Sequence, residues 1–289
     1  MLTTLLLAHN IPVSGSIIKQ PKLAATLTQL GRKGHKGFYQ GEVANNIISD
    51  LQKAGAAWTP QDLNDYKVIE RPPIFFKYKG SSVTTTPPPS YGGVALHQAL
   101  KAIERSNTSD ITVKKSTPMN IKTEMPTNES EAFMSQISII DQWGNKASVS
   151  LSMNMPFGSA FTSPTTGILL NNSLAKFTAS PNSRSEIDVI EPGKRPQSYM
   201  TPTLIESSDS LTIIGASSGK HTSTTLLLTI LNYVDNASAS QKATLEAMGH
   251  NAQEQQQKHS DLQIVHSNRT KGRIEASSSP TGGGQAIVR

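Results

Sequence analysis

Residues 134–154 carry the clearest alternation of hydrophobic and polar side chains in this chain. In the first half, Ile137 and Ile139 alternate with polar neighbours, which predicts a β-strand with one buried face. Residues 141–145 (DQWGN) predict a turn, because glycine and asparagine tolerate positive φ. A second alternating strand is expected over 146–153. The two strands predict a hairpin whose ends lie side by side, and any chemistry is expected at that end.

The same patterning predicts a mixture of helices and strands elsewhere. Helices are expected over residues 20–30, 41–54, 92–104 and 221–234, with a short helix starting at Thr59-Pro60. Strands are expected over residues 74–78, 81–86, 167–172 and 211–216. This mixed order predicts an α+β layered fold.

Two stretches lack periodicity. Residues 106–131 are rich in Ser, Thr, Asn, Lys and Pro, which predicts an exposed polar linker. From about residue 236 the chain becomes polar, with a glutamine-rich tract at 253–257 and a Ser/Gly-rich end. A loosely ordered tail is expected there.

Composition narrows the possible functions. The net charge is +6, but the basic residues are scattered and form no stripe with aromatics, so nucleic-acid binding is not expected. No hydrophobic run reaches the roughly 20 residues that a membrane span needs, and the opening MLTTLLLAHN lacks the features of a signal peptide. With zero cysteines there is no thiolate nucleophile, and no two of the seven histidines have metal-ligand spacing on a helix. Neither a metal nor a cofactor is predicted.

Eight motifs occur in an order that resembles the γ-glutamyltransferase (glutathione hydrolase) family. They are QPKLAATL (20–27), GFYQGEVA (37–44), DLNDY (62–66), PPPSYGG (87–93), IID with GN (139–145), FGS (157–159), GILLNN (167–172) and GKRP (193–196). Each motif alone is a weak signal, but eight in the same order form a specific one.

The resemblance implies an N-terminal-nucleophile hydrolase with a four-layer αββα sandwich, of which this chain contains a part. In the family, the precursor cuts itself before a threonine, which becomes the first residue of a small subunit. The hydroxyl of that threonine attacks the substrate, and its freed amine serves as base. The γ-glutamyl group of glutathione then passes to an amino acid, a dipeptide or water.

Alignment of 139–141 without gaps places the family's nucleophilic threonine on Met134. A thioether cannot attack a carbonyl as an alkoxide does. Anchoring instead on residues 129–131 gives Phe133, which is no better suited. A slip forward gives Ser135, which has a hydroxyl, but a one-residue slip turns a strand side chain to the opposite face. Ser135 is therefore kept only as a substitute nucleophile.

The resemblance places further site residues along the rest of the chain. The supporting threonine falls on Ser152 and an asparagine ligand on Asn154, although both also suit the satisfied polar end of a hairpin. The acid that holds the substrate's α-ammonium falls on Lys176, which reverses the charge. The serine pair that binds the α-carboxylate falls on Ser198 and Tyr199. The glycine pair of the oxyanion hole falls on Ser218 and Gly219.

These departures predict a catalytically impaired member of the family. Residues 1–133 correspond to the later part of a large subunit, and residues 134–289 to a small subunit. The segment that bears the family's carboxylate-binding arginine is expected upstream of this sequence. The expected ligand is glutathione or another γ-glutamyl compound, and the expected location, from the resemblance alone, is periplasmic or extracellular. The alternative is a non-enzymatic relative that binds a γ-glutamyl ligand or a partner chain supplying the front half.

Overall fold

A computed structural model describes residues 14–105, 133–177, 189–217, 219–234, 261–279 and 284–288. The chain divides into two compact units. The first comprises the chain up to Glu70 together with Met155–Asn172, and the second comprises Arg71–Asn154 and the chain from Ser173 onward. These spatial units differ from the predicted division at residue 133, which concerns processing and stays a prediction.

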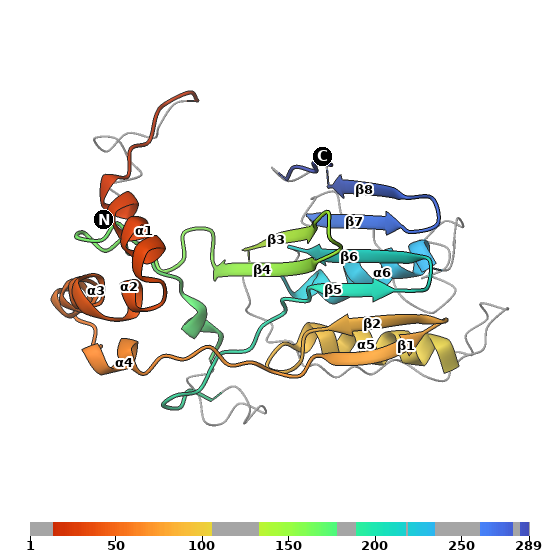
Figure 1. Ribbon diagram of the computed structural model, residues 1–289. Helices are drawn as coiled ribbons and strands as arrows, with labels where there is room; N and C mark the ends of the chain where they lie inside the picture. The colour runs from red at the N-terminus through yellow and green to blue at the C-terminus, as the bar shows by residue number, and fades with distance from the viewer. Residues whose placement is uncertain are drawn as a thin grey trace. The chain divides into compact units, whose positions relative to one another are not determined.

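The first unit is helical, with α1 (Pro21–Lys33), α2 (Lys36–Tyr39), α3 (Gly41–Lys53) and α4 (Pro60–Asn64) (Figure 1). The expected helix starts are confirmed, because proline occupies the first position of α1 and of α4. The carboxylate of Asp62 accepts hydrogen bonds from the backbone N–H and the hydroxyl of Thr59, at 2.7 and 2.8 Å. These contacts satisfy groups at the start of α4.

The core of this unit forms between α3 and the segment 155–172. The buried side chains of α3 are Val43, Ala44, Ile47, Ile48 and Leu51, and Phe161, Ile168 and Leu170 pack against them. Residues 167–172 therefore pack as an irregular segment, and the predicted strand there is wrong. The only pairing recorded within that stretch, among the described residues, is an isolated bridge between Thr162 and Leu169. Its apolar side chains pack against a helix rather than within a sheet.

Asp50 of α3 binds the segment 155–172 through its carboxylate. The residue is buried, with 5% of its surface exposed. Its Oδ2 accepts hydrogen bonds from the Ser163 hydroxyl at 2.6 Å, and from the Thr165 hydroxyl and N–H at 2.6 and 2.9 Å. Burial raises the pKa of the Asp50 carboxyl, but these hydrogen bonds outweigh it and lower that pKa below 3.8. The charged form is therefore the one that stabilises this unit.

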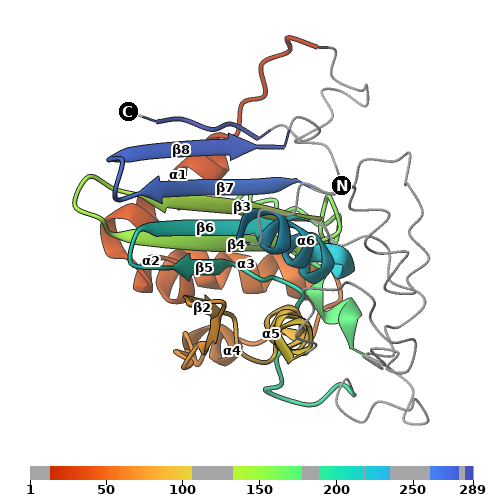
Figure 2. The ribbon, with the colours of Figure 1, turned by 90° about the vertical axis from the view of Figure 1, so that its right-hand side faces the viewer.

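The second unit contains an antiparallel sheet of six strands in the order β1-β2-β5-β6-β7-β8. The strands are β1 (Ile74–Tyr78), β2 (Ser81–Thr85), β5 (Thr203–Glu206), β6 (Ser210–Ala216), β7 (Leu262–Asn268) and β8 (Arg273–Ser278). Helices α5 (Tyr91–Arg105) and α6 (Thr222–Val234) cover one face of the sheet (Figures 1 and 2). Short 3₁₀ turns, η1 (Ser173–Lys176) and η3 (Gly219–His221), complete the described elements.

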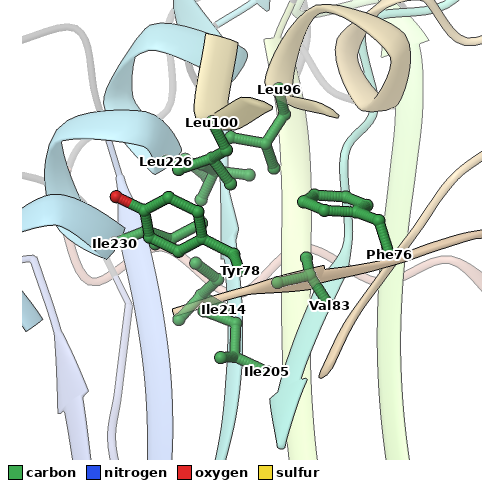
Figure 3. Close-up of a cluster of buried hydrophobic side chains, with 10 residues drawn as sticks. Phe76, Tyr78, Val83, Leu96, Leu100, Ile205, Ile214, Leu226 and Ile230 are labelled. Carbon is green, nitrogen blue, oxygen red and sulfur yellow. The ribbon is translucent and has the colours of Figure 1, made fainter. Parts of the chain in front are cut away.

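Apolar side chains fill the space between this sheet and its two helices (Figure 3). Leu96 and Leu100 of α5 meet Leu226 and Ile230 of α6, over Tyr78 of β1. All five are fully buried. The 3.6-residue spacing on the helices and the alternation on the strands both direct these residues inward.

The predicted hairpin is confirmed as β3 (Phe133–Ile140) and β4 (Lys146–Asn154). It forms a separate two-stranded sheet on the face of the large sheet opposite the helices (Figures 1 and 2). The second unit therefore has three layers of an α+β fold: helices, a large sheet and a small sheet.

The burial of the hairpin differs from the expectation drawn from alternation. The alternation itself is confirmed, but the polar face, with Gln136 and Ser138, is the half-buried one. The side chains of Ile137 and Ile139 are 44% and 50% exposed. Periodicity shows that a strand has two different faces, but only the neighbouring layer decides which face is covered.

The loosely ordered tail expected from about residue 236 is wrong over the last two strands. Residues 262–278 form β7 and β8, which extend the large sheet by two antiparallel strands. All seven β7 residues are half-buried, and the strand pairs with β6 on one flank and β8 on the other. The expected linker at 106–131 and residues 236–260 lie outside the described residues.

The Asp50 contacts lead to a prediction about stability. Substitution Asp50→Asn removes a charged acceptor of three hydrogen bonds and is expected to lower the free energy of unfolding by about 3 kcal/mol at pH 7. A carboxyl with a lowered folded-state pKa stabilises the protein above its unfolded pKa and loses this effect as pH falls through the folded pKa. The difference between the two proteins should therefore shrink below pH ~4.

Urea unfolding measured between pH 7 and pH 3 tests this expectation. Asp65→Asn is the matched control, since Asp65 is exposed and its carboxylate accepts one hydrogen bond of 2.6 Å from the exposed side chain of Gln61. This control should stay within about 0.5 kcal/mol of the unchanged protein. An Asp50→Asn loss that does not vary with pH would contradict a role for the ionised carboxylate.

Candidate functional site

The open end of the hairpin brings three of the expected site residues together. Met134 pairs directly with Ser152 across β3 and β4, and Phe133 pairs with Asn154. The register shifts at this point, which leaves Met153 as the extra residue of a bulge. The extra residue of a bulge changes the direction in which the neighbouring side chains point at the end of a strand pair.

Asn154 adopts a left-handed conformation with φ 70° and is buried. Asparagine is one of the few residues that tolerate this region. Its N–H donates a hydrogen bond of 2.9 Å to the Ser152 hydroxyl oxygen. Ser152 and Asn154 thus form one local arrangement at the end of β4, beside Met134.

Ser135 lies on the other face of β3 from Met134. Its side chain is exposed, on the same face as Ile137 and Ile139, while Met134 is half-buried. Ser152, directly opposite Met134, shares the half-buried face. A hydroxyl at position 135 is therefore directed away from the arrangement of Ser152 and Asn154.

Gln136 fixes the inner face of the hairpin on the large sheet. Its Nε2 donates to the Ser148 hydroxyl at 2.9 Å, and its Oε1 accepts from the Ser150 hydroxyl at 2.5 Å. The carboxamide lies against Gly215 of β6, where a Cβ atom would collide with it. A glycine inside a strand of Ile and Ala is the sequence signal for such a close approach, and patterning alone did not use it.

The direction of β3 over the sheet follows from two contacts. Gln136 lies at Gly215, whereas Lys146, the pairing partner of Ile140, contacts Glu206, which pairs with Leu211 of β6. Increasing residue number along β3 therefore corresponds to decreasing number along β6. Met134, two residues before Gln136, lies towards the end of β6 from which the chain continues to Gly219.

A salt bridge holds the turn end of the hairpin. Lys146 Nζ lies 2.5 Å from a carboxylate oxygen of Glu206 on β5, and Arg269 contacts the other oxygen at 2.6 Å. The hydrogen bond from Lys146, followed by that from Arg269, outweighs partial burial and lowers the pKa of Glu206. With Gln136 near one end and Lys146 at the other, the hairpin has two polar anchors.

Asn172 holds the two ends of the segment 155–172 together. Its Oδ1 accepts a hydrogen bond of 3.1 Å from the Met155 N–H. Met155 follows Asn154 directly, and η1 with Lys176 follows Asn172 directly. The chain therefore returns close to the point where it left the hairpin, and the GILLNN motif supplies the residue responsible.

Lys176 and Tyr199 come together although 22 residues separate them along the chain. Lys176 Nζ lies over the Tyr199 ring, 6.0 Å from its centroid. The Tyr199 side chain is 5% exposed, and Lys176 is half-buried. The position of the expected acid thus lies near half of the expected serine pair, and the roles of both stay predictions.

Ser198 is held by the PPPSYGG motif. Its N–H donates to the Pro89 carbonyl at 3.0 Å, its carbonyl accepts from the Tyr91 N–H at 2.9 Å, and its hydroxyl oxygen accepts from the Met200 N–H. Gly92, at the start of α5, allows the helix to approach this segment, because a Cβ there would collide with the Thr201 hydroxyl. The motif thus positions the irregular segment that contains Ser198, which forms an isolated bridge with Ser90.

Gly219 begins η3 with φ 54° and is buried. Its carbonyl accepts a hydrogen bond of 2.7 Å from the Thr222 hydroxyl, which fixes the start of α6. Ser218, the other half of the expected oxyanion pair, lies outside the described residues. Glycine suits this left-handed position, so the local geometry at Gly219 is that of a tight strand-to-helix turn.

Within the part of the chain that the structure describes, no group of three or more His, Cys, Asp or Glu side chains is arranged to hold a metal ion. No helix there is both long and apolar enough to cross a membrane.

Comparison with known proteins agrees with the motifs. The family model of γ-glutamyltranspeptidase matches residues 2–127 and 109–244. The chain is 28% identical to the glutathione hydrolase proenzyme of Pseudomonas sp. (strain A14), over 76% of this chain and 49% of that protein. It is 30% identical to glutathione hydrolase 2 of Arabidopsis thaliana, over 72% of this chain and 46% of that protein. The chain therefore spans about half the length of these curated relatives.

A solved structure supports the fold assignment. Cephalosporin acylase from Bacillus halodurans superimposes with a TM-score of 0.79 at 20% identity, over 99% of this chain and 66% of that chain. At this identity the likeness establishes the fold, which is the α+β fold of the N-terminal-nucleophile hydrolases. Together with the family match, which covers most of the chain, it confirms the resemblance seen in the motifs: the chain belongs to the γ-glutamyltranspeptidase family.

Proposed function

We propose that this chain is a γ-glutamyltransferase-family protein that neither cuts itself nor transfers γ-glutamyl groups. The observation that carries the proposal is Met134, which lies opposite Ser152 at the position that aligns with the family's nucleophilic threonine. A methionine thioether carries no proton that a base can remove. It therefore offers neither the alkoxide-like nucleophile nor the acyl shift that self-cleavage requires.

The neighbouring hydroxyl does not compensate for this loss. Ser135 is exposed and lies on the face of β3 opposite to Ser152. Its hydroxyl could reach the face that carries Ser152 only if the pairing of β3 with its neighbours slipped by one residue. Such a slip would also remove the Gln136 carboxamide from Gly215.

The groups that would surround a ligand remain in part. Ser152 and Asn154 keep a hydroxyl and an amide at the hairpin end, and Gly219, at the expected oxyanion position, has a left-handed backbone with φ 54°. The proposed ligand is a γ-glutamyl compound such as glutathione, bound without turnover. A periplasmic or extracellular location accompanies this proposal, on the family resemblance alone.

One observation favours a second function, the binding of a partner chain. The outer face of the hairpin exposes Ile137, Ile139, Val149 and Leu151 by 40–56%, and no charged residue lies among them on β3 or β4. Among the described residues, each of the two strands pairs only with the other, so the outer edge of each is open. Exposed apolar surface next to unpaired edges is typical of a sheet that receives a further strand or layer.

The first prediction concerns processing. The purified 31.1 kDa chain is expected to run as one band on a denaturing gel after prolonged incubation at 37 °C. It is also expected to release no chromophore from a γ-glutamyl chromogenic amide. The glutathione hydrolase proenzyme of Escherichia coli serves as the positive control for both assays. Two bands that sum to the full mass, with a cut before Met134, would contradict the proposal.

The second prediction concerns the cause of the loss. Met134→Thr restores a hydroxyl on the face shared with Ser152, so cleavage between residues 133 and 134 is expected to become detectable by mass spectrometry. Met134→Val is the matched control, because it has the shape of threonine without the hydroxyl, and it should stay uncut. If Met134→Thr combined with Lys176→Asp also stays uncut, Met134 is not the main cause of the loss.

The third prediction tests the partner function. The probe is the part of the Pseudomonas sp. (strain A14) relative that its alignment with this chain leaves uncovered, expressed as a separate tagged polypeptide. We expect it to bind this chain, and Ile137→Lys to weaken binding about tenfold, because a charge would be buried in an apolar contact. Phe75→Lys, at a 61% exposed position of β1, is the control and should leave binding unchanged. Absence of binding, or equal effects of both substitutions, would contradict this function.

A further inference from the structure

The outer edge of β3 lies beside a hollow. Among the described residues, β3 pairs only with β4, so the N–H and C=O groups of its other edge have no partner in a ladder. A hollow of about 220 Å³ has residues 136–138 of β3 in its wall, together with parts of β7 and β8. No described residue of β4 lines it, so the hollow lies on the side of β3 that faces away from β4.

Residues 284–288 form another wall of this hollow. Residues 284–287 line it, and Gly284 lies against the side-chain ends of Gln263 and Ser278, where a Cβ atom would collide with both. Gln263 of β7 pairs with Ser278 of β8, so this contact fixes where the segment meets the large sheet. From there the segment runs back beside β8 (Figure 2).

The start of this segment and the middle of β3 lie at the same level of the large sheet. Gln136 of β3 rests on Gly215 of β6, and Gly215 pairs with Gln263, the residue that Gly284 touches. A segment that starts at this level can reach the edge of β3 by a sideways shift alone, without first sliding along the strand.

Little apolar burial holds residues 284–288 in this place. All five are exposed, and Ile287 and Val288 expose 57% and 54% of their surface. Within the described chain, the segment forms no ladder with β3 or with β8. Its two β-branched residues are nevertheless typical of strands. The segment therefore has the composition of a strand without the pairing of one.

We propose that residues 284–288 are a displaceable strap, which closes the hollow by pairing with the outer edge of β3 as a third strand of the small sheet. This pairing satisfies backbone groups on both segments and covers an edge that is otherwise open to other chains. The inference deepens the partner function proposed above and rests on it for one consequence. A partner strand that enters at the outer edge of β3 has to displace the strap first.

Amide hydrogen exchange of the full chain at pH 7, followed by mass spectrometry, tests the closure. Ala286→Pro removes a backbone donor from the strap and restricts φ, so the strap cannot complete a ladder. Peptides that cover residues 134–140 are expected to exchange about fivefold faster in this variant than in the unchanged chain. Ala286→Val is the matched control, because valine keeps the N–H and favours a strand. It should exchange no faster than the unchanged chain.

Peptides that cover β6 are the internal reference for this measurement. They should exchange at the same rate in all three proteins, because neither substitution touches the ladder of the large sheet. Equal exchange of residues 134–140 in Ala286→Pro and in the unchanged chain would overturn the strap. Faster exchange of β6 by the same factor would also overturn it, since the whole unit would then be loosened rather than one edge opened.

The same variants test the competition with a partner. The probe is the tagged fragment of the Pseudomonas sp. (strain A14) relative that serves in the third prediction. Ala286→Pro is expected to bind it about threefold more tightly than the unchanged chain, because the strap no longer competes for the edge. Ala286→Val should bind it no more tightly than the unchanged chain. Equal binding of the fragment to Ala286→Pro and to the unchanged chain would refute the competition.

The failure of this inference and the failure of the partner function give different results. If the fragment binds none of the three proteins, the partner function is refuted, and the exchange of residues 134–140 alone decides on the strap. If the fragment binds but the exchange does not respond to Ala286→Pro, the strap is refuted and the partner function stands.

Discussion

The position of the hairpin β3–β4 on the large sheet depends on a polar side chain that packs between the two sheets, where apolar side chains are usual. The Gln136 carboxamide bonds Ser148 and Ser150 of the neighbouring strand and rests on Gly215 of the large sheet. A buried amide is costly unless its donors and acceptors are paired, and here both ends are paired. This contact sets the register of the hairpin over β6, and through it the place of Met134 and Ser152 relative to the turn at Gly219.

A second constraint lies in the segment 155–172, which leaves the hairpin and returns to η1. The buried carboxylate of Asp50 holds its middle, and the side chain of Asn172 joins its ends. Asn154 directly before it and Lys176 four residues after it belong to the candidate site. The GILLNN motif thus supplies a hydrogen bond that joins the two ends of the segment.

The altered positions differ in kind. Met134 has no hydroxyl at the position that aligns with the family's threonine, whereas Ser152 and Asn154 beside it carry polar groups. Lys176 and Tyr199 have changed in a way that is internally consistent, since the new cation faces the new ring.

Patterning and motif order by themselves determined the family, the helix starts at Pro21 and Pro60, the hairpin with its paired ends, and the buried strand β6. These follow from local chemistry, in which proline, glycine and alternation act over a few residues. Patterning did not reveal β7 and β8, because their half-buried, mixed side chains show no clear alternation. It also failed at residues 167–172, whose apolar side chains pack on α3 rather than in a ladder.

Only the tertiary structure decided which face of the hairpin is covered and which residues meet across long separations. Alternation shows that Gln136 and Ile137 point in opposite directions, but the burial of Gln136 depends on Gly215, nearly 80 residues further along the chain. Likewise, Lys176 was identified as a charge reversal from sequence, but its contact with Tyr199 needed the folded chain. The reason is the same in both cases. Local patterns restrict the backbone, whereas the partner of a side chain is set by which distant segment packs against it.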